Sequence, residues 1–380
     1  MNFTYDEEQQ ALREAVRALV GRSYADFENR RRTVAEEPGF DEKLWARLAE
    51  MGVLGLPFAE EYGGMGAGPV EVGIVAQELG RVVAPEPFLT AVVLSGGVVA
   101  AAGTEEQRAV VLEAVASGEV VLAFAHAEPG ARWADTATAV TAHGSGAGWT
   151  LSGVKEPVPR GAHADRLVVS AALPSGGPGL FLVDTNAPGL DRTGYATHDG
   201  GRAARIAFDA TPAVPLGEAV DQTAVIAGCL DAARIAACNE AVGAMEVALS
   251  TTTAYLKSRK QFGVALNTFQ ALTFRAADMY VSLELARSIA LWASMVLASG
   301  SPDEAAEAAS RAALQVSRAG RHIGQEAIQL HGGIGMTAEY SIGSYTSRLT
   351  ALEHLLGDGR FHLARLAGTI AGHDEVDPLR

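Results

Sequence analysis

The spacing of apolar side chains divides the chain into three stretches of different character. Up to about residue 118, apolar positions recur at helical spacing, as in Asp6–Val20 and Asp41–Met51. The same pattern predicts helices over 70–83, 87–103 and 104–117, and the glycine-rich run Glu61–Gly68 predicts a loop between helices. We therefore predict a helical N-terminal domain over residues 1–118.

Short β-type runs replace this pattern from residue 119. Each run is rich in β-branched or aromatic residues and is bounded by Gly, Pro, Ser or Asp. The predicted strands are 120–125, 137–142, 149–153, 166–171, 179–184 and 204–209. So many short strands within about 90 residues are typical of a compact β-barrel or sandwich, which we place at residues 119–220.

The pattern becomes helical again from residue 221. Long alanine-rich helices are predicted over 222–258, 269–299, 302–330 and 337–371, with short connections between them. Ser301-Pro302-Asp303-Glu304 is a typical helix start. Such helices favour an up-and-down four-helix bundle over residues 221–380. The fold class is α+β and mainly α.

Composition narrows the function classes. The chain has 380 residues, 48% hydrophobic residues and a net charge of −15, which argues against nucleic acid or an anionic membrane as a partner. Cys229 and Cys238 lie nine residues apart in one predicted helix, so they face opposite sides and cannot pair. We find no metal-ligand spacing, no apolar run of transmembrane length and no signal-peptide pattern, and we expect a cytoplasmic setting.

Two C-terminal segments carry the candidate chemistry. The first is Arg259–Gln270, read as RKQFGVALNTFQ, and the second is Gln329–Gly335, read as QLHGGIG. An arginine matches a diphosphate bidentately, and a Gly-Gly pair lets the backbone approach a ligand closely. Taken alone, Arg259 also fits a surface ion pair, and the glycines also fit a simple break between helices.

Together with Leu44–Gly66, these segments resemble the signatures of the acyl-CoA dehydrogenase family, and the resemblance covers nearly the whole chain. It implies that Arg259 contacts the pyrophosphate of FAD. The other FAD contacts implied by the match are Gln261, Phe262, Phe269 and Gln270, with Gln329, Gly332 and Gly333 at the adenylate half. In the family these contacts reach the neighbouring subunit's FAD, so the resemblance implies a dimer or a tetramer.

The match also extends to Leu230-Asp231-Ala-Ala-Arg234, which resembles the family's helix start near the substrate. Arg234 is therefore a candidate substrate-binding residue. An ion pair between Asp231 and Arg234, three residues apart on one helix, explains the same arginine equally well.

The barrel departs from the family pattern at the flavin ring. In the loop His126–Asp135, Glu128 and Pro129 remain, while Arg132-Trp133 replaces a Gly-Ser pair. A second signature, normally Trp-Ile-Thr-Asn-Gly, reads Pro157–Gly161 here, and prolines supply no backbone donor. We expect the barrel's contacts with the ring to be altered or lost.

The catalytic base departs as well. The family's usual glutamate position holds Leu356, and a second position used by some members holds Ala233. We take Glu240 as the candidate base, because its apolar neighbours would raise its pKa if it is buried. A paired helix glutamate is the alternative. Glu353 and Asp358 rank below Glu240.

Three functions remain open at this stage. The first is a flavin-dependent dehydrogenase that introduces an α,β double bond into an acyl-CoA or acyl-carrier thioester and passes electrons to an electron-transfer flavoprotein. The second is a non-catalytic partner subunit of a heterotetrameric acyl-CoA dehydrogenase, which donates contacts across the interface to FAD. The third is a flavin-free scaffold or binding protein.

Overall fold

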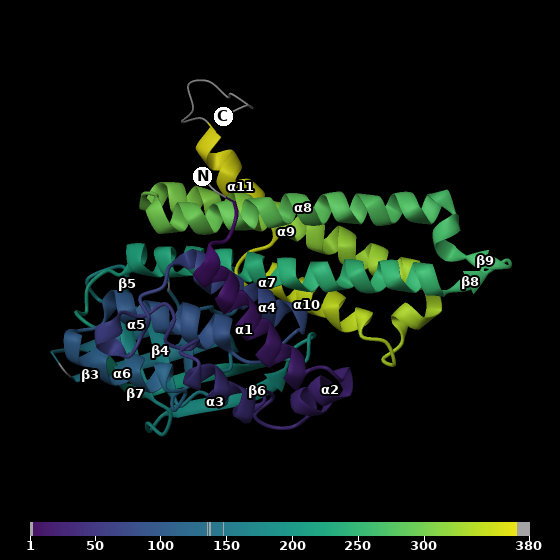
Figure 1. The fold of residues 1–380 in the computed structure, drawn as a ribbon. Helices are drawn as coiled ribbons and strands as arrows, with labels where there is room; N and C mark the ends of the chain where they lie inside the picture. The colour runs from purple at the N-terminus through teal and green to yellow at the C-terminus, as the bar shows by residue number, and fades with distance from the viewer. Residues whose placement is uncertain (1–2, 135, 137, 147, 371–380) are drawn as a thin grey trace.

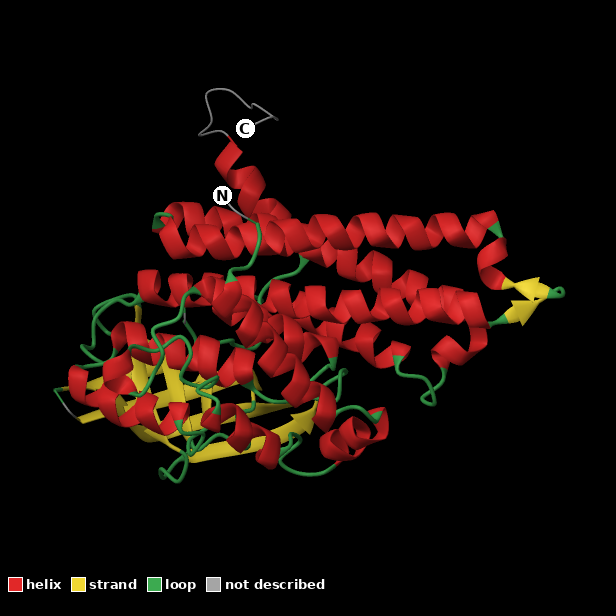
Figure 2. Cartoon of the chain, in the orientation of Figure 1, coloured by secondary structure: helices red, strands yellow, loops and turns green. Residues whose placement is uncertain are grey.

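The computed structural model describes residues 3–134, 136, 138–146 and 148–370. The strands lie almost entirely in the middle of the chain, beneath a layer of helices, and a small hairpin projects from the far end of the long helices (Figures 1 and 2). The N-terminal helices are α1 (Glu7–Ser23), α2 (Phe27–Ala35), α3 (Glu42–Glu50), η1 (Glu60–Tyr62), α4 (Pro69–Arg81), α5 (Gly97–Ala102) and α6 (Glu105–Ala116), with the π-helix η2 (Phe88–Gly96) before α5.

The middle of the chain forms a sheet that closes on itself. The strands are β1 (Leu122–Ala125), β2 (Thr141–Ser145), β3 (Gly148–Pro159), β4 (Arg166–Ala172), β5 (Pro178–Asp184), β6 (Leu190–Ala196) and β7 (Arg202–Pro215). The pairings β4–β2, β2–β3, β3–β7, β7–β5 and β5–β4 complete a ring, and β1 and β6 add to β4 and β7. The predicted barrel is therefore confirmed.

Long helices form the C-terminal part. They are α7 (Thr223–Ser258), α8 (Gln270–Ser299), α9 (Pro302–His331), α10 (Ile342–Leu355) and α11 (Gly359–Thr369), with a hairpin of β8 (Lys260–Gln261) and β9 (Val264–Ala265) and the short helices η3 (Leu266–Thr268) and η4 (Gly332–Met336). α7, α8 and α9 lie lengthwise beside one another (Figure 1). The predicted bounds of these three helices hold to within one residue.

The prediction of one helix over 337–371 is wrong. The chain breaks between α10 and α11, where Gly357 has φ +128°, a conformation that favours glycine. Asp358 then caps α11, because its carboxylate accepts the backbone N–H of Phe361 at 2.8 Å. The elements missed include α2, the hairpin strands β8 and β9, and the largely exposed β6, whose sequence does not alternate. β2 begins later than predicted, and residue 137 of the predicted strand lies outside the described residues.

Two apolar cores meet at β1. Leu122 and Phe124 face the large core formed by the N-terminal helices and the bundle, whereas Ala123 and Ala125 face the inside of the barrel. Because successive side chains of a strand point to opposite faces, this one strand joins the barrel to the helical layers. Residues at the end of β1 therefore lie where all three parts of the chain come together.

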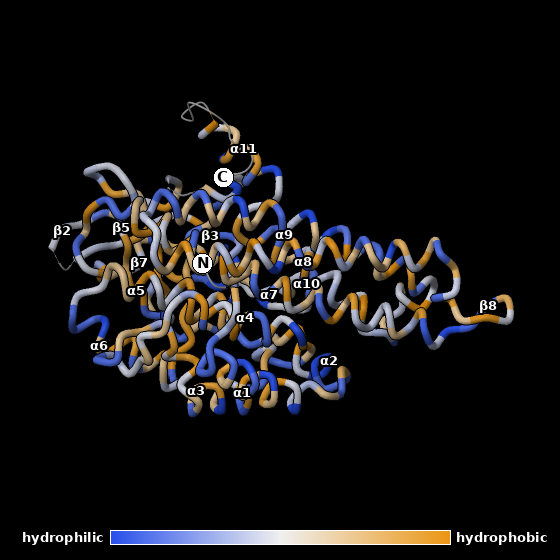
Figure 3. The backbone as a smooth tube through the Cα atoms, turned by 45° about the horizontal axis from the view of Figure 1, so that its top comes forward, coloured by the Kyte–Doolittle hydropathy of each residue, from blue (hydrophilic) through white to orange (hydrophobic). Residues whose placement is uncertain are grey.

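Among the described helices, α8 is long and apolar enough to cross a membrane by length and composition, which the sequence analysis did not anticipate. α8 nevertheless packs along α7 and α9, as a bundle helix does. Polar and apolar positions alternate along it (Figure 3). Phe274, Val281 and Leu285 on this helix are more than half exposed. The helix therefore has one face in the bundle core and an apolar outer face.

Candidate functional site

Both FAD-related segments lie at the same end of the bundle, which we call the bundle tip (residues 255–270 and 329–340). Arg259 ends α7, and Phe262 lies in the turn of the β8–β9 hairpin with 92% of its surface exposed. Gln261, Gln270 and Gln329 are also exposed, and Phe269 is half-buried. The guanidinium of Arg259 makes no ion pair with any of the described residues. The described chain therefore gives no support to the surface ion-pair explanation of Arg259.

An aromatic stack joins the two segments of the tip. The ring of His331 lies 4.6 Å from the ring of Tyr255 and 4.9 Å from the ring of Tyr340. The Nδ1 of His331 lies 2.7 Å from the carbonyl oxygen of Ala327 and donates to it. Its Nε2 is buried and has no partner within the described part of the chain. Burial lowers the pKa of His331 and so disfavours the protonated ring. The tip thus offers one unused buried polar atom next to the glycines.

The two glycines of the tip differ from ordinary packing glycines. A Cβ added to Gly332 or Gly333 would meet no atom within 4 Å. Gly332 has φ +66°, which explains its identity, but Gly333 has neither a positive φ nor a close neighbour. At Gly335, in contrast, a Cβ would lie 2.8 Å from the carbonyl oxygen of Ile328. Nothing within the described chain requires glycine at 333, whereas close approach of an outside ligand would.

A second candidate site is a cavity of about 80 Å³ between η2, the barrel and the bundle, which we call the interdomain cavity. It contains the positions that the resemblance assigns to the flavin ring and the base. Its lining residues include Phe124, His126, Ala127, Trp133, Arg234 and Leu356. It is mainly apolar, and Leu356 stands where the family carries its glutamate.

The tip and the interdomain cavity lie far apart on the same helix. Arg234 lines the cavity and Arg259 ends the helix at the tip. Both lie on or at the end of the continuous helix α7, so 25 residues at 1.5 Å each separate them by about 37 Å. No arginine side chain spans such a distance. Arg259 therefore cannot serve a ligand ring held in its own chain's cavity at the position of Arg234.

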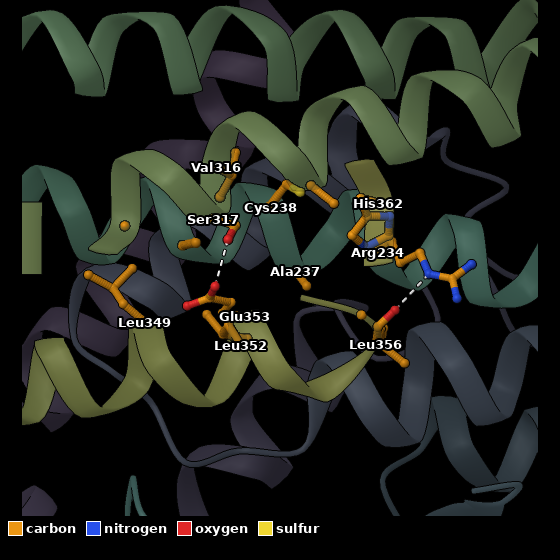
Figure 4. A pocket seen from close by; sticks show the side chains of 14 residues that line it. Arg234, Ala237, Cys238, Val316, Ser317, Leu349, Leu352, Glu353, Leu356 and His362 are labelled. Atoms are coloured by element: carbon orange, nitrogen blue, oxygen red, sulfur yellow. Dashed lines mark hydrogen bonds between the residues drawn. The ribbon is translucent and has the colours of Figure 1, made fainter. Parts of the chain in front are cut away.

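Arg234 is tied into the cavity wall. Its Nε donates to the carbonyl oxygen of Leu356 at 2.9 Å (Figure 4). Its Nη1 pairs with Asp231 at 2.7 Å. Its guanidinium also lies 5.5 Å from the ring of Phe361. The helical ion pair expected as the alternative is thus present. Arg234 fixes the end of α10 to α7, which positions Leu356.

Trp133 packs across the cavity between the barrel and the bundle. Its indole Nε1 donates to the carbonyl oxygen of His354 at 2.9 Å, and its ring lies 5.7 Å from the ring of Phe361. Trp133 adopts φ +52°, an uncommon conformation for a bulky residue. Pro157 and Pro159, which also line the cavity, offer no N–H. Because Trp133 occupies space and the two prolines supply no backbone donor, this cavity is poorly suited to bind a flavin ring.

A buried polar network supports the barrel side of this cavity. The Nζ of Lys155 donates to Glu128 at 2.8 Å, to the carbonyl oxygen of His126 at 2.9 Å and to Ser170 at 3.2 Å. Burial lowers the pKa of Lys155 to about 8, while Lys155 and backbone N–H groups, notably that of Val140, lower the pKa of Glu128 to about 2 despite desolvation. The sequence analysis missed Lys155. A lysine at an inward position of β3 was the available signal.

The proposed base, Glu240, is held in an ion triad. Its Oε1 accepts a hydrogen bond from Nε of Arg348 at 2.7 Å and lies 2.6 Å from Nη2 in an ion pair, and Nη1 of Arg348 pairs with Asp199 at 2.6 Å. Burial raises the pKa of Glu240, although the charge of Arg348 opposes the shift. Glu240 does not line the interdomain cavity. The geometry thus favours the paired-glutamate alternative, and the sequence analysis missed Arg348, its partner.

The two lower-ranked acids are also engaged. Glu353 accepts from Ser317 at 2.8 Å and pairs with Arg321 at 2.6 Å, and it lies on the wall of a narrow space between α7, α9 and α10 (Figure 4). Asp358 caps α11. Each carboxylate named as a candidate base therefore has a structural partner.

A chain of N-terminal helices, a closed barrel and a helical bundle, with an exposed cationic tip, defines a class of flavin-dependent dehydrogenase folds. Family models agree: the acyl-CoA dehydrogenase N-terminal domain matches residues 6–119, and the acyl-CoA dehydrogenase C-terminal domain matches residues 223–370. The chain belongs to the acyl-CoA dehydrogenase family, whose members are FAD-dependent oxidoreductases.

Individual relatives cover nearly the whole chain. The "Probable acyl-CoA dehydrogenase YngJ" of Bacillus subtilis (strain 168) is 30% identical, over 96% of this chain and 98% of the relative. A variant of the Tcur3481-Tcur3483 steroid ACAD is 36% identical with a TM-score of 0.88, over 96% of this chain and 98% of that chain. The ChsE4-ChsE5 complex from Mycobacterium tuberculosis is 27% identical with a TM-score of 0.89, over 99% of this chain and 100% of that chain.

Proposed function

We propose that this chain is a subunit of a mixed acyl-CoA dehydrogenase assembly, in which it donates the bundle tip to an FAD seated mainly on a companion chain. One observation carries the proposal: the groups suited to a dinucleotide are exposed at the tip, about 37 Å along α7 from the chain's own cavity. A tip so placed serves a ligand on another protomer.

The residues of the interdomain cavity also agree with a subunit that donates FAD contacts and does not carry out the oxidation itself. Leu356 has no proton to give or take, Pro157 and Pro159 have no N–H to donate, and Trp133 fills space between the barrel and α11. Glu240 is bound by Arg348. Among the described residues, the chain thus offers cross-interface contacts but no free carboxylate lining its own cavity, which is the pattern that a donating subunit requires.

Two of the similar structures are named for pairs of proteins, Tcur3481-Tcur3483 and ChsE4-ChsE5. A mixed tetramer of two such pairs agrees with the exposed tip and the apolar outer face of α8, which carries Phe274, Val281 and Leu285. By its family, the assembly would oxidise an acyl thioester and pass electrons to an electron-transfer flavoprotein.

The residues of the tip have distinct roles in this proposal. FAD, when bound, supplies the hydride acceptor for the oxidation. Arg259 would neutralise the diphosphate with two parallel N–H donors, and Gln329 would add amide hydrogen bonds. Gly332 and Gly333 would let the backbone approach the adenylate half, and Phe262 would cover it from water. The residues of the tip fit the group, because its cation, its glycines and the buried Nε2 of His331 have no other partner in the described chain.

The test is flavin content per chain. The chain purified by itself should hold little or no flavin, and it should become yellow when co-expressed with a companion family member that carries the glutamate. In the mixed assembly, Arg259→Gln should lower flavin retention during gel filtration, while Arg318→Gln, an exposed arginine on α9, should not. One flavin per chain in the protein purified by itself would refute the proposal that FAD is held mainly by a companion chain.

The alternative of a self-sufficient dehydrogenase, with Glu240 as its base, makes the opposite prediction. It requires Glu240→Gln to abolish turnover in the lone, flavin-loaded chain. Because Glu240 is bound by Arg348, we expect Glu240→Gln in the mixed assembly to leave turnover within about twofold and to affect only thermal stability.

A further inference from the structure

A larger cavity of about 270 Å³ lies behind the interdomain cavity, and no role described above uses it. The two cavities share a wall formed by Thr90, Pro157, Pro159 and Leu355. The volume approaches the lower end of small-molecule sites, roughly 300–1,000 Å³. We call it the arginine cavity, because Arg30, Arg160, Arg202 and Arg348 all line it.

The positive charge of this cavity is only partly compensated. Arg160 donates to the carbonyl oxygens of Pro38 at 2.9 Å and Gly39 at 3.4 Å, and Arg30 donates to those of Val83 at 2.6 Å and Asp199 at 3.1 Å. Neither guanidinium forms an ion pair with a carboxylate in the part of the chain that the structure describes. Carbonyl groups orient a guanidinium without cancelling its charge.

The arginines also repel one another. Burial lowers the pKa of Arg160 to about 10; the charges of Arg348 and Arg202 act in the same direction, while Glu86 and Asp199 oppose the shift. Arg348 lowers the pKa of Arg30 in the same way, after burial. Asp199 also lines the cavity, and Arg348 is already paired with Asp199 and Glu240, so the charges without a carboxylate partner in the described chain are those of Arg30 and Arg160. An anion placed between them would relieve this repulsion.

Glu86 adds an unused buried hydrogen-bonding atom to the same wall. It is 6% exposed, and its Oε1 accepts from the hydroxyl of Tyr24 at 2.6 Å and from the N–H of Asp41 at 3.2 Å. Its Oε2 is buried and has no partner in the described chain. A carboxyl group with one free oxygen beside several guanidinium groups is suited to meeting a second carboxyl group, because one proton can be shared between the two.

The rest of the lining is apolar. Pro87, Leu89, Ala203, Ala351 and Leu355 complete the wall around the polar groups. A small inorganic ion would leave these apolar surfaces exposed to water, whereas a carboxylate on a hydrocarbon body would cover them. The lining therefore favours an amphipathic ligand with one anionic end.

We propose that the arginine cavity binds an organic carboxylate with an apolar body of about six carbon atoms. Its carboxylate would lie among the guanidinium groups, and its hydrocarbon part would contact the prolines and alanines. The site is distinct from the bundle tip and needs no FAD. Ligand binding in the arginine cavity can therefore be tested independently of the proposed assembly.

Calorimetric titration of the full-length chain at pH 7 tests the proposal with three matched probes. Hexanoate carries both the charge and the apolar body, hexan-1-ol carries the body without the charge, and inorganic phosphate carries charge without the body. We expect saturable one-to-one binding of hexanoate and at least tenfold weaker binding of the other two. Equal binding of hexan-1-ol, equal binding of phosphate or no saturable hexanoate heat would each overturn the proposal.

Two variants test the location. Arg202→Gln removes the arginine with the weakest contacts, since its Nη1 lies 3.5 Å from the oxygen of Gly200 and its Nε lies 3.5 Å from Glu37. It should weaken hexanoate binding about tenfold. Ala351→Phe fills the cavity from α10 without changing charge and should abolish binding. Arg318→Gln, remote on α9, should leave binding unchanged, and undiminished binding in both cavity variants would place the ligand elsewhere.

Discussion

Replacing Arg348 by methionine tests the assignment of Glu240 to a structural ion triad. The guanidinium donates one hydrogen bond to Glu240 at 2.7 Å and one to Asp199 at 2.6 Å, and its Nη2 lies 2.6 Å from Glu240 in an ion pair. The two carboxylate side chains are only 6% and 5% exposed. Arg348→Met leaves both acids buried without their cation, and such losses cost about 3–5 kcal/mol. At about 2.1 cal/mol/K for each of the 380 residues, the unfolding entropy near Tm is roughly 0.8 kcal/mol/K.

Differential scanning calorimetry should therefore show Arg348→Met melting about 4–6 °C below the parent chain. The triple variant with Glu240→Gln and Asp199→Asn removes the buried charges as well, and it should recover most of the difference. Arg318→Met, on the exposed side of α9, is the matched control and should change Tm by less than 1 °C. A single variant as stable as this control, or a triple variant no better than the single one, would refute the triad as a stabilising unit.

Three further predictions test other parts of the structure. Burial raises the pKa of Glu86 from its ordinary 4.5 to about 7. Between these two pH values the native state retains a proton that the unfolded chain has lost. The contribution of this proton to the free energy of unfolding is therefore complete below about pH 4.5 and disappears as the pH rises to 7. Glu86→Gln should therefore gain stability relative to the parent between pH 5 and 8, by at most about 3 kcal/mol in a pH series of denaturant midpoints. Lys155→Met should lower stability by about 3–5 kcal/mol and Lys155→Met with Glu128→Gln by much less, measured by urea unfolding, because the single variant leaves a buried carboxylate without its cation. Gly333→Ala should leave Tm unchanged but reduce flavin retention in the mixed assembly, whereas Gly335→Ala should lower Tm because its Cβ would meet a backbone oxygen at 2.8 Å. An equal loss of Tm in both glycine variants would remove the argument for a ligand at Gly333.

The spacing of apolar residues along the sequence predicted most of the fold. α7, α8 and α9 were predicted almost to the residue because each combines a long helical pattern with clear ends, such as the capping box at Ser301. The break after Leu355 was missed because leucines and an alanine-rich sequence continue across it. Only the left-handed backbone of Gly357 and the cap by Asp358 end α10 there.

The candidate site was likewise predicted in part from the sequence and in part decided by the tertiary structure. Sequence placed Arg259 and Gln329 in one functional group, and folding brings their segments to one end of the bundle through the stack of Tyr255, His331 and Tyr340. Sequence could not show that Glu240 meets Arg348, because 108 residues separate the two. The apolar neighbours that made Glu240 a candidate base are compatible with either outcome.

The sequence by itself determined the order of helices, barrel and bundle, the family, and the residue types that suit a dinucleotide, since each of these depends on local pattern and spacing. The tertiary structure alone decided which charges meet. It paired Glu240 with Arg348, put Trp133 across the interdomain cavity, gathered four arginines around a second cavity and held the tip away from both. The physical reason is that the spacing of apolar residues is a property of a single helix or strand and can be read from its own sequence. The partner of a buried charge, in contrast, depends on contacts between elements that are distant in the chain.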